Sequence, residues 1–483
     1  MRKALQQQGF EPLAGLREHD GDIVRAAAAN APNGKPIFTI DQVIAQLTRT
    51  GTAWNGIGSN PVPNAGLGTI TYAFFDNAAQ VYSSEQSEFQ PLSEAQRNAV
   101  RQAFALLGEI IDVRFIEGVV ATADMNFGNL ATTDDYYSAY ASLPERSREA
   151  GDIWFNLNSP SNQEVGLAGI GFRIILHEML HAIGISHPSN YNAQEGVTLT
   201  YEANAAYFQD SLQYTIMSYF ASSSTGAVRT AFAATPMAHD IAAIQDIYGA
   251  NMTTRTGDTV YGFNSNATLA AYDFSLNTSP VIAIWDAGGR DTLDFSGWSS
   301  ASRIDLEPGA SSDGGGQTTN VQIAYGAWIE NAVGGAGNDV ISGNSASNRL
   351  QGGGGDDMLN GLAGTDRAEG GAGADIFVFS AAGHSMGYLL RSDGAKFTPD
   401  VLVDFTSGVD KIDLSAIDAI AGTAVDDAFA FIGTAAFSNQ AGQLRFEAAD
   451  GLVQIFGDLD GNGVADLHII AGGPQVLAGD FIL

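Results

Sequence analysis

The stretch GFRIILHEMLHAIGISHP, Gly171 to Pro188, contains three of the seven histidines of the chain. His177 and His181 are four residues apart, so a helix places both imidazoles on one face. Gly184 allows the chain to turn after the helix, and His187 can return as a third ligand. Three neutral imidazoles leave one position of a tetrahedral zinc ion open, which is typical of a catalytic zinc site.

Glu178 lies beside the first histidine and is not itself expected to bind the metal. Zinc lowers the pKa of its bound water towards about 7, and Glu178 is placed to take that proton and pass it to a leaving amine. The expected reaction is hydrolysis of a peptide bond. Two alternatives are a buried amphipathic helix with incidental histidines and a zinc site without catalysis, but the second leaves Glu178 without a role.

The spacing His-Glu-x-x-His-x-x-Gly-x-x-His resembles the zinc signature of the metzincins, which is followed by a Met-turn. Thirty residues beyond His187 the chain reads Tyr-Thr-Ile-Met-Ser-Tyr, from Tyr214 to Tyr219. By resemblance, Met217 forms the apolar floor beneath the zinc histidines. Pro188 and Tyr219 resemble the serralysin branch, in which this tyrosine can ligate zinc and stabilise the oxyanion of the tetrahedral intermediate.

Composition limits the remaining function classes. The 483 residues are long enough for two or three domains. A net charge of −32 argues against nucleic acid and anionic membranes as partners and favours calcium as the counter-charge. The absence of cysteine excludes disulfides and thiolate metal sites. No apolar run reaches the roughly 18 residues of a membrane span, so we expect no stable membrane insertion.

Five nonapeptides follow one another without a gap in the second half of the chain. They read GGAGNDVIS, GNSASNRLQ, GGGGDDMLN, GLAGTDRAE and GGAGADIFV and begin at residues 334, 343, 352, 361 and 370. The sixth place holds Asp339, Asn348, Asp357, Asp366 and Asp375, and the eighth holds Ile341, Leu350, Leu359, Ala368 and Phe377. A flexible Gly-rich linker would not keep this spacing at two places in every repeat.

The nonapeptides are typical of a calcium-binding parallel β-roll. Glycines such as Gly334, Gly352 and Gly370 let the turn wrap closely around an ion, and the aspartates supply oxygen ligands together with backbone carbonyls. The apolar residue at the eighth place stacks into a thin core. Two repeats depart from the pattern, because Asn348 lacks a charge and Arg367 with Ala368 weakens the fourth repeat. We expect calcium to bind there weakly or not at all.

Other acidic segments resemble those that hold calcium between the domains of serralysins. The candidate ligands are Arg255, Gly257, Thr259, Asp286, Gly288, Asp291 and Glu330. The segment Asp458 to Gly463 begins like an EF-hand loop, but Ile469 stands where a bidentate glutamate is needed. A calcium site and a plain turn both remain open for that segment.

Local patterns predict several other elements. Ser93 to Gln96 is a capping box that opens an apolar-faced helix running towards Ile111, and strands are expected at 113–117, 124–128 and 152–156. A further helix over 239–248 ends at Gly249, contains a structural His239 and resembles the last helix of serralysin catalytic domains. A short helix is expected over 414–420. By resemblance, Met125 to Gly128 is the edge strand that pairs with an extended substrate, although an ordinary edge strand fits equally well.

The predicted fold is multidomain α+β. Residues 1–37 are a leader or short pro-segment, as in a zymogen, and residues 38–251 form a metzincin α/β catalytic domain. Residues 252–483 form an all-β domain with a parallel β-roll and a β-sandwich. No apolar region typical of a Sec leader follows Met1 to Leu5. The final residues, Gly479 to Leu483, resemble the uncleaved type I export signals of this family.

The resemblance as a whole implies a secreted bacterial zinc endopeptidase of the serralysin family, with Glu178 and Tyr219 as catalytic residues and Zn²⁺ and Ca²⁺ as cofactors. The expected partners are protein or peptide substrates and a type I secretion exporter, and the expected state is an extracellular monomer. The alternatives are a non-catalytic calcium-binding RTX adhesin or toxin module with a vestigial protease domain, and an astacin-like or matrixin-like peptidase. Glu178 argues against the first alternative, and Pro188 with the nonapeptides argues against the second.

Overall fold

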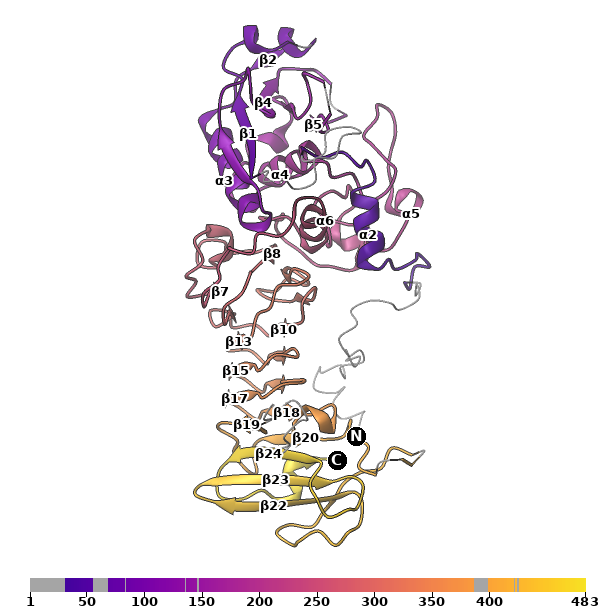
Figure 1. The fold of residues 1–483 in the computed structure, drawn as a ribbon, viewed down its shortest axis with the longest axis vertical. Helices are drawn as coiled ribbons and strands as arrows, with labels where there is room; N and C mark the ends of the chain where they lie inside the picture. Colours follow the sequence, from indigo (N-terminus) through magenta and orange to yellow (C-terminus); the bar gives the residue numbers. More distant parts are fainter. Residues whose placement is uncertain are drawn as a thin grey trace.

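The computed structural model is elongated, with the longer helices and one sheet at one end and a stack of short strands leading to the other (Figure 1). It describes residues 31–54, 68–82, 84–134, 136–145, 147–385, 398–420, 422–423 and 425–483. Most of the expected leader or pro-segment, residues 1–37, lies outside these ranges. Within them, no helix combines the length and apolar character needed to cross a membrane.

The first sheet has the strand order β3-β1-β4-β6-β5, and β2 pairs with β4. Its strands are β1 (Thr69–Phe74), β2 (Phe89–Gln90), β3 (Arg114–Glu117), β4 (Met125–Leu130), β5 (Ala139–Ala141) and β6 (Ile153–Asn156). Neighbours run parallel along this order except β5, which is antiparallel to β6. The three strands expected around 113–117, 124–128 and 152–156 are therefore confirmed.

The expectation that Met125 to Gly128 forms an edge is wrong. Strand β4 lies between β1 and β6, and all six of its residues are buried. Met125 and Phe127 pack in the core, while Asn126 and Asn129 hydrogen-bond to Asp152 and Gln96. Side chains on both faces of β4 are therefore packed or hydrogen-bonded. The strand at the edge of the sheet beyond β6 is the short, half-buried β5.

Helices cover this end of the molecule. They are α2 (Ile40–Leu47), α3 (Glu94–Ile110), α4 (Ile170–Ala182), α5 (Tyr201–Asn204) and α6 (Ala238–Tyr248). Single 3-10 turns occur at Ala78–Gln80, Ser84–Ser87, Pro160–Gln163, Ser222–Thr225, Ala270–Tyr272, Ala382–His384 and Ala478–Asp480. The capping box of α3 is confirmed by the reciprocal bonds between Ser93 and Gln96, and α6 ends at Gly249 as predicted.

Helix α4 carries the expected His-Glu-x-x-His pattern and packs through Phe172, Leu176 and Leu180, all fully buried. The chain turns immediately afterwards at Gly184, whose φ is 107°. A Cβ atom at this position would clash with the carbonyl oxygen of Thr52. Only glycine permits both the positive φ and this close approach.

The second half is built from three further sheets. Their strands are β7 (Val260–Gly262), β8 (Ile282–Ile284), β9 (Thr292–Asp294), β10 (Arg303–Asp305), β11 (Ser311–Ser312), β12 (Val321–Ile323), β13 (Asn331–Val333), β14 (Val340–Ser342), β15 (Arg349–Gly354), β16 (Met358–Asn360), β17 (Arg367–Ala372), β18 (Ile376–Val378), β19 (Asp400–Leu402), β20 (Lys411–Asp413), β21 (Ala430–Phe431), β22 (Gln443–Ala449), β23 (Leu452–Asp458), β24 (Leu467–Gly472) and β25 (Phe481–Ile482). One sheet has the strand order β21-β22-β23-β24-β19-β17-β15-β13-β9-β7, the second has the order β10-β14-β16-β18-β20-β25, and β11, β12 and β8 form the third.

The nonapeptides form a parallel β-roll, as predicted. Val340 pairs with Met358 and Arg349 pairs with Arg367, an offset of 18 residues in each sheet. Two nonapeptides therefore make one coil, and the labelled strands β13, β15, β17 and β19 descend the middle of the molecule (Figure 1). The eighth-place side chains of all five repeats are buried between the two sheets.

Residues 414–420 do not form the expected helix. The carboxylate of Asp413 accepts a hydrogen bond from the amide of Ser415, and Asp418 accepts bonds from the amides of Ile420 and Asp427. These local bonds compete with the helical backbone pattern and fix a series of turns. Strands β22, β23 and β24 are antiparallel and close the far end of the molecule.

Contacts cross the boundary that the sequence predicts after residue 251. Most of the buried apolar side chains from α2 to β25 form one continuous cluster, which includes residues of both halves. On β12, the side chain of Gln322 accepts a bond from the Ala238 amide (3.1 Å) and donates to the Gln213 carbonyl (2.9 Å). Arg229 donates to the carbonyl of Gln213 (3.1 Å) and to that of Thr319. The first strands of the C-terminal half therefore support the loop that follows α5.

Gly184 provides a test of the turn that returns the chain after α4. Replacing Gly184 by alanine combines a positive φ with a steric clash and is expected to cost about 2–5 kcal/mol of folding stability. Gly196→Ala is the matched control, because Gly196 also has a positive φ but no atom within 4 Å of its added Cβ. Urea unfolding in saturating calcium measures both; equal losses would contradict the role given to the close approach.

Candidate metal centres and catalytic residues

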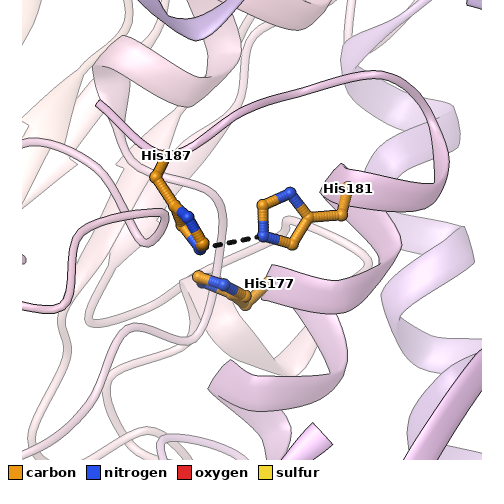
Figure 2. Close-up of side chains that lie close together, drawn as sticks. All are labelled: His177, His181 and His187. Atoms are coloured by element: carbon orange, nitrogen blue, oxygen red, sulfur yellow. Dashed lines mark hydrogen bonds between the residues drawn. The ribbon is translucent and has the colours of Figure 1, made fainter. Parts of the chain in front are cut away.

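The three predicted histidines meet at one point. Helix α4 presents His177 and His181 one turn apart, and the chain beyond Gly184 brings His187 back to them (Figure 2). One ring nitrogen from each lies within 4.8 Å of the others. The Nε2 atoms of His181 and His187 are 3.0 Å apart.

Backbone carbonyls fix the orientation and tautomer of each ring. The Nδ1 atom of His177 bonds to the Ile216 carbonyl (2.8 Å), and that of His181 to the Ile185 carbonyl (2.6 Å). The Nδ1 atom of His187 bonds in the same way to the carbonyl of Tyr191 at 2.9 Å. A carbonyl oxygen only accepts, so each Nδ1 carries the hydrogen and each neutral ring directs an Nε2 lone pair inward.

The histidine cluster fits a zinc ion. Burial lowers the pKa of His181 to about 3 and that of His187 to about 4, and it lowers the pKa of His177 well below its ordinary value. All three rings are therefore neutral at pH 7, as metal ligands must be. Tetrahedral zinc with nitrogens at about 2.0 Å separates two of them by about 3.3 Å, close to the observed 3.0 Å.

The other predicted members of this site lie around the histidines. Glu178 is buried, and burial raises the pKa of its carboxyl to about 8 while the charge of Arg173 opposes the rise. Met217 is fully buried in the loop after α5. The Tyr219 ring is 4.5 Å from that of His187 and 6.0 Å from that of His177, and 41% of the residue is exposed.

Sequence reasoning missed Asp240, which supports His177 from behind. This buried carboxylate accepts bonds from the Thr215 hydroxyl (2.5 Å), the Ile216 amide (2.8 Å) and the Met237 amide (2.8 Å). Since the Ile216 carbonyl receives the His177 Nδ1 bond, helix α6 holds the first ligand through this loop. The only signal in the sequence is an acidic residue in the first turn of α6, which looks like an ordinary cap.

Asp210 supports His187 in the same way and was also missed. Its carboxylate accepts bonds from the hydroxyls of Ser189 (2.5 Å), Tyr191 (2.8 Å) and Ser218 (2.7 Å). The Tyr191 carbonyl receives the His187 Nδ1 bond, and Ser218 follows Met217. One buried carboxylate thus joins the loop after His187 to the predicted Met-turn.

A second cluster lies where the two halves meet. The Asp291 carboxylate accepts the Thr259 amide (2.7 Å), the Asp291 amide binds the Glu330 carboxylate (2.7 Å), and Asp286 accepts the Gly288 amide (2.8 Å). Burial raises the pKa of Asp291 to about 7, with the charges of Asp286 and Glu330 adding to the rise. The other Asp291 oxygen is buried with no hydrogen-bond partner, which suits a calcium ligand.

The remaining predicted members of this cluster differ in orientation. Gly257 lies beside Thr259, whose hydroxyl donates to the Gly257 carbonyl at 3.0 Å. The Arg255 side chain binds the Glu109 carboxylate and the Trp285 carbonyl instead. Only the backbone carbonyl of Arg255 could therefore act as a cation ligand.

The sixth-place aspartates of the roll form a ladder along one edge. The amide of Asp339 binds the Asp357 carboxylate (2.7 Å), the amide of Asp357 binds Asp375 (2.9 Å), and the amide of Asp375 binds Asp410 (3.0 Å). On the other edge, the amide of Asp366 binds Asp400 at 2.8 Å. Asp400 and Asp410 were missed because they follow the repeats outside the nine-residue spacing.

These carboxylates are crowded and incompletely satisfied. Burial raises the pKa of Asp357 to about 8 and that of Asp366 to about 9, with neighbouring carboxylates adding to both rises. One oxygen of each is buried without a hydrogen-bond partner. A Cβ atom at Gly334, Gly352 or Gly370 would clash with the aspartate of the same repeat, so the first glycine is needed for the turn to close on its carboxylate.

In the second repeat, side-chain amides stand where the other repeats have a carboxylate. Asn348 donates to the Glu330 carbonyl (2.9 Å) and to the Asn344 side chain (3.0 Å). Asn344 in turn donates to the carbonyls of Leu306 (3.0 Å) and Ile329 (2.9 Å). In the fourth repeat, by contrast, Asp366 keeps the ladder geometry, although Arg367 is exposed and Ala368 is small.

The Asp458 loop closes on its own backbone. The Asp458 carboxylate accepts the amides of Gly461 (2.8 Å) and Gly463 (2.9 Å). Asp460 and Asp466 lie close enough to Asp458 for three carboxylates to share one ion. Asp466, rather than Ile469, could therefore supply the last carboxylate ligand of this loop. A calcium site at this position remains a prediction.

Comparisons with known proteins agree along the whole chain. Residues 250–483 match the family model described as peptidase M10 serralysin C terminal. The chain is 41% identical to the metalloprotease AprA of Pseudomonas entomophila, over 97% of this chain and 95% of that protein. It is 40% identical to serralysin of Photorhabdus laumondii (86% and 85% covered) and 37% identical to serralysin A of Dickeya chrysanthemi (93% and 92% covered).

The support that Asp240 gives His177 can be tested by Asp240→Asn. Asparagine cannot accept all three bonds, so buried donors are left unpaired, at a cost of about 2–5 kcal/mol in stability. Metal affinity is expected to fall about 10- to 100-fold, as for lost outer contacts of a ligand. Asp246→Asn, on the exposed face of the same helix, is the control. Chelator competition and thermal unfolding measure both; equal metal affinity in the two variants would contradict the assignment.

Proposed function

Because this chain belongs to the serralysin family of metalloproteases and is a metalloendopeptidase, we propose that it hydrolyses extracellular proteins with zinc at the histidine cluster and Glu178 as general base. The observation that carries the proposal is the convergence of three neutral Nε2 atoms beside a buried, non-ligating carboxylate. Residues 38–251 are proposed to form a metzincin catalytic domain, and residues 252–483 a calcium-binding roll and sandwich.

His177, His181 and His187 would hold the zinc ion, and Tyr219 is close enough to be a further, exchangeable ligand. When bound, zinc acts as a Lewis acid that polarises the substrate carbonyl and lowers the pKa of a bound water. The carbonyl bonds at each Nδ1 keep the three rings in the tautomer that leaves Nε2 free. No proton has to leave these rings for the ion to bind.

Glu178 accepts the proton of the attacking water and delivers it to the nitrogen of the leaving amine. Burial raises its pKa in the metal-free site, and the charge of a bound zinc ion would oppose that rise and favour the ionised carboxylate that acts as the base. The phenol of Tyr219 can donate to the carbonyl oxygen as negative charge develops on it. Burial raises the pKa of Tyr219 to about 12, so the phenol keeps its hydrogen at neutral pH.

An extended substrate has one suitable strand partner near α4. Strand β5 pairs only with β6 among the described strands, and its residues are half-buried. Its free side can add a peptide strand by backbone hydrogen bonds. This assigns to β5 the pairing role that sequence reasoning gave to Met125–Gly128.

Calcium is proposed to occupy the crowded carboxylate sites of the second half. The ligands would come from Asp286, Asp291 and Glu330 near the junction and from the ladder aspartates of the roll, together with backbone carbonyls. Extracellular calcium is high enough to fill sites with dissociation constants of about 10⁻⁴ to 10⁻³ M, whereas cytosolic calcium is not. We therefore propose that the monomeric chain leaves the cell through a type I exporter and folds outside.

Glu178→Ala tests the general base. The variant should bind zinc and fold normally but lose about two to four orders of magnitude in kcat/KM, because a proton acceptor is removed. Glu202→Ala, an exposed glutamate on α5, serves as control. Peptide kinetics and metal analysis measure the effect. Activity within a few-fold of wild type would remove Glu178 from the mechanism.

The calcium proposal predicts a specific pH dependence. In the ion-free roll the raised pKa values of Asp357 (about 8) and Asp366 (about 9), caused by burial, favour protonation. Their contribution to stability is complete at low pH and is lost as pH rises through these values. In EGTA the melting temperature should therefore fall from pH 6 to pH 8, whereas in calcium it should not.

Calcium binding should also release protons at pH 7 and tighten as pH rises, because the ion displaces them. Calorimetry of the full chain in two buffers with different ionisation enthalpies measures the number of protons. The double variant Asp357→Asn and Asp366→Asn should bind less calcium and release fewer protons. A melting temperature in EGTA that rises with pH, without proton release on calcium addition, would contradict the proposal.

A further inference from the structure

Arg173 differs from the other inward-facing arginines of the first half. It lies on α4 one turn before His177, and its immediate neighbours Phe172 and Ile174 are buried, whereas Arg173 is partly exposed. Residues four apart share a helix face, so its side chain lies on the face that carries the first histidine. The charge of Arg173 acts on both Glu178 and Tyr219, where it opposes the rise in pKa that burial causes.

The guanidinium of Arg173 has no partner in the part of the chain that the structure describes. Its Nε is buried without a hydrogen bond, and no carboxylate lies within ion-pair distance. Its one recorded contact is with the ring of Phe232, whose centroid is 5.7 Å away. A half-buried guanidinium without an acceptor is destabilising, because arginine stays charged and all its hydrogens need acceptors.

Three other arginines show what a purely structural arginine does in this fold. Arg49 donates to the carbonyls of His187 and Ser189, Arg229 to those of Leu212 and Gln213, and Arg255 to the Trp285 carbonyl and the Glu109 carboxylate. Each of them joins segments that are far apart in the sequence. Among the described residues Arg173 makes no such hydrogen bond, so a structural role of this kind does not account for it.

The surroundings of Arg173 are open to a substrate. Tyr219 is 41% exposed and Phe232 is 36% exposed. The guanidinium therefore borders on a surface that a bound peptide can reach. Glu178 and Tyr219, which act on the reacting peptide bond in the proposed mechanism, both feel its charge, so Arg173 lies beside that bond.

We propose that Arg173 forms a substrate subsite that binds the carboxylate of an aspartate or glutamate directly after the scissile bond. This rests on the proposed peptidase function. Guanidinium and carboxylate form two parallel charge-assisted hydrogen bonds, which the neutral amide of glutamine cannot match. The incoming carboxylate also supplies the acceptor that Arg173 lacks among the described residues.

The test uses the full-length chain loaded with zinc and calcium, and peptides that differ only in having Glu, Gln or Lys after the scissile bond. For wild type, kcat/KM should favour Glu over Gln by about 10- to 100-fold and disfavour Lys. In Arg173→Gln the Glu/Gln ratio should fall to about 1. Arg173→Lys should show an intermediate ratio, since lysine keeps the charge but lacks the planar fork.

Arg114→Gln is the control for net charge, because Arg114 is exposed on β3. It should keep the wild-type ratio. Thermal unfolding of each variant checks that the fold is retained, and the Arg173→Lys ratio remains informative if Arg173→Gln is unstable. An unchanged Glu/Gln ratio in Arg173→Gln, or in Arg173→Lys if that is the stable variant, would overturn the subsite while leaving the peptidase function intact.

Binding separates the subsite from the chemistry. The same peptides are titrated into the Glu178→Gln variant with and without Arg173→Gln, and fluorescence anisotropy reports the affinity. A preference for the Glu peptide that disappears with Arg173→Gln supports the subsite even if wild type hydrolyses none of the peptides, in which case only the peptidase proposal fails. Equal affinities for Glu and Gln peptides when Arg173 is present would contradict the subsite directly.

Discussion

The hydrogen bond from His177 to the Ile216 carbonyl is the contact on which the metal centre depends, because Ile216 lies in a loop without regular structure. Asp240 on α6 holds the amide of Ile216, and Gln322 on β12 binds the nearby Gln213 carbonyl. The geometry of the site is therefore set by elements on both sides of residue 251. The first half of the chain therefore depends on β12 of the second half to hold the loop that orients His177.

Two buried carboxylates hold the loops whose carbonyls accept the histidine hydrogen bonds. Asp240 holds the loop that binds His177, and Asp210 holds the loop that binds His187. Neither forms an ion pair with another described residue; each accepts hydrogen bonds from hydroxyl or amide donors, most of them in the loops that carry the histidine partners. Charge-assisted bonds of this kind are stronger than neutral ones and fix direction as well as distance. The loops can thus lack secondary structure and still hold imidazole rings in place.

Patterns that are local in sequence were predictable, and those that depend on distant pairing were not. The zinc-helix spacing, the cap of α3 and the nine-residue repeat of the roll all follow from neighbouring residues. Strand β4 was wrongly placed at an edge because strand order is decided by which segments pair across the sheet. Residues 414–420 were misread because side chains of Asp413 and Asp418 take the amides that a helix would use.

The supporting residues of the site escaped prediction for a related reason. Asp210, Asp240 and Arg173 belong to no spacing pattern, and their importance comes from what they face in the folded chain. Asp400 and Asp410 continue the aspartate ladders, but their distances of 34 and 35 residues from Asp366 and Asp375 break the repeat. A carboxylate aligned by folding need not be aligned in sequence.

The second repeat of the roll is held by the neutral side chains of Asn344 and Asn348, where the other repeats have a carboxylate. Asn344 and Asn348 carry no charge and have no proton to gain or lose between acid and alkaline conditions. Their bonds to the carbonyls of Leu306, Ile329 and Glu330 therefore do not depend on the protonation of either side chain. If calcium fills the aspartate sites as proposed, its withdrawal would loosen the coils that hold them, and the bonds of Asn344 and Asn348 would still fix the strand register in the second repeat.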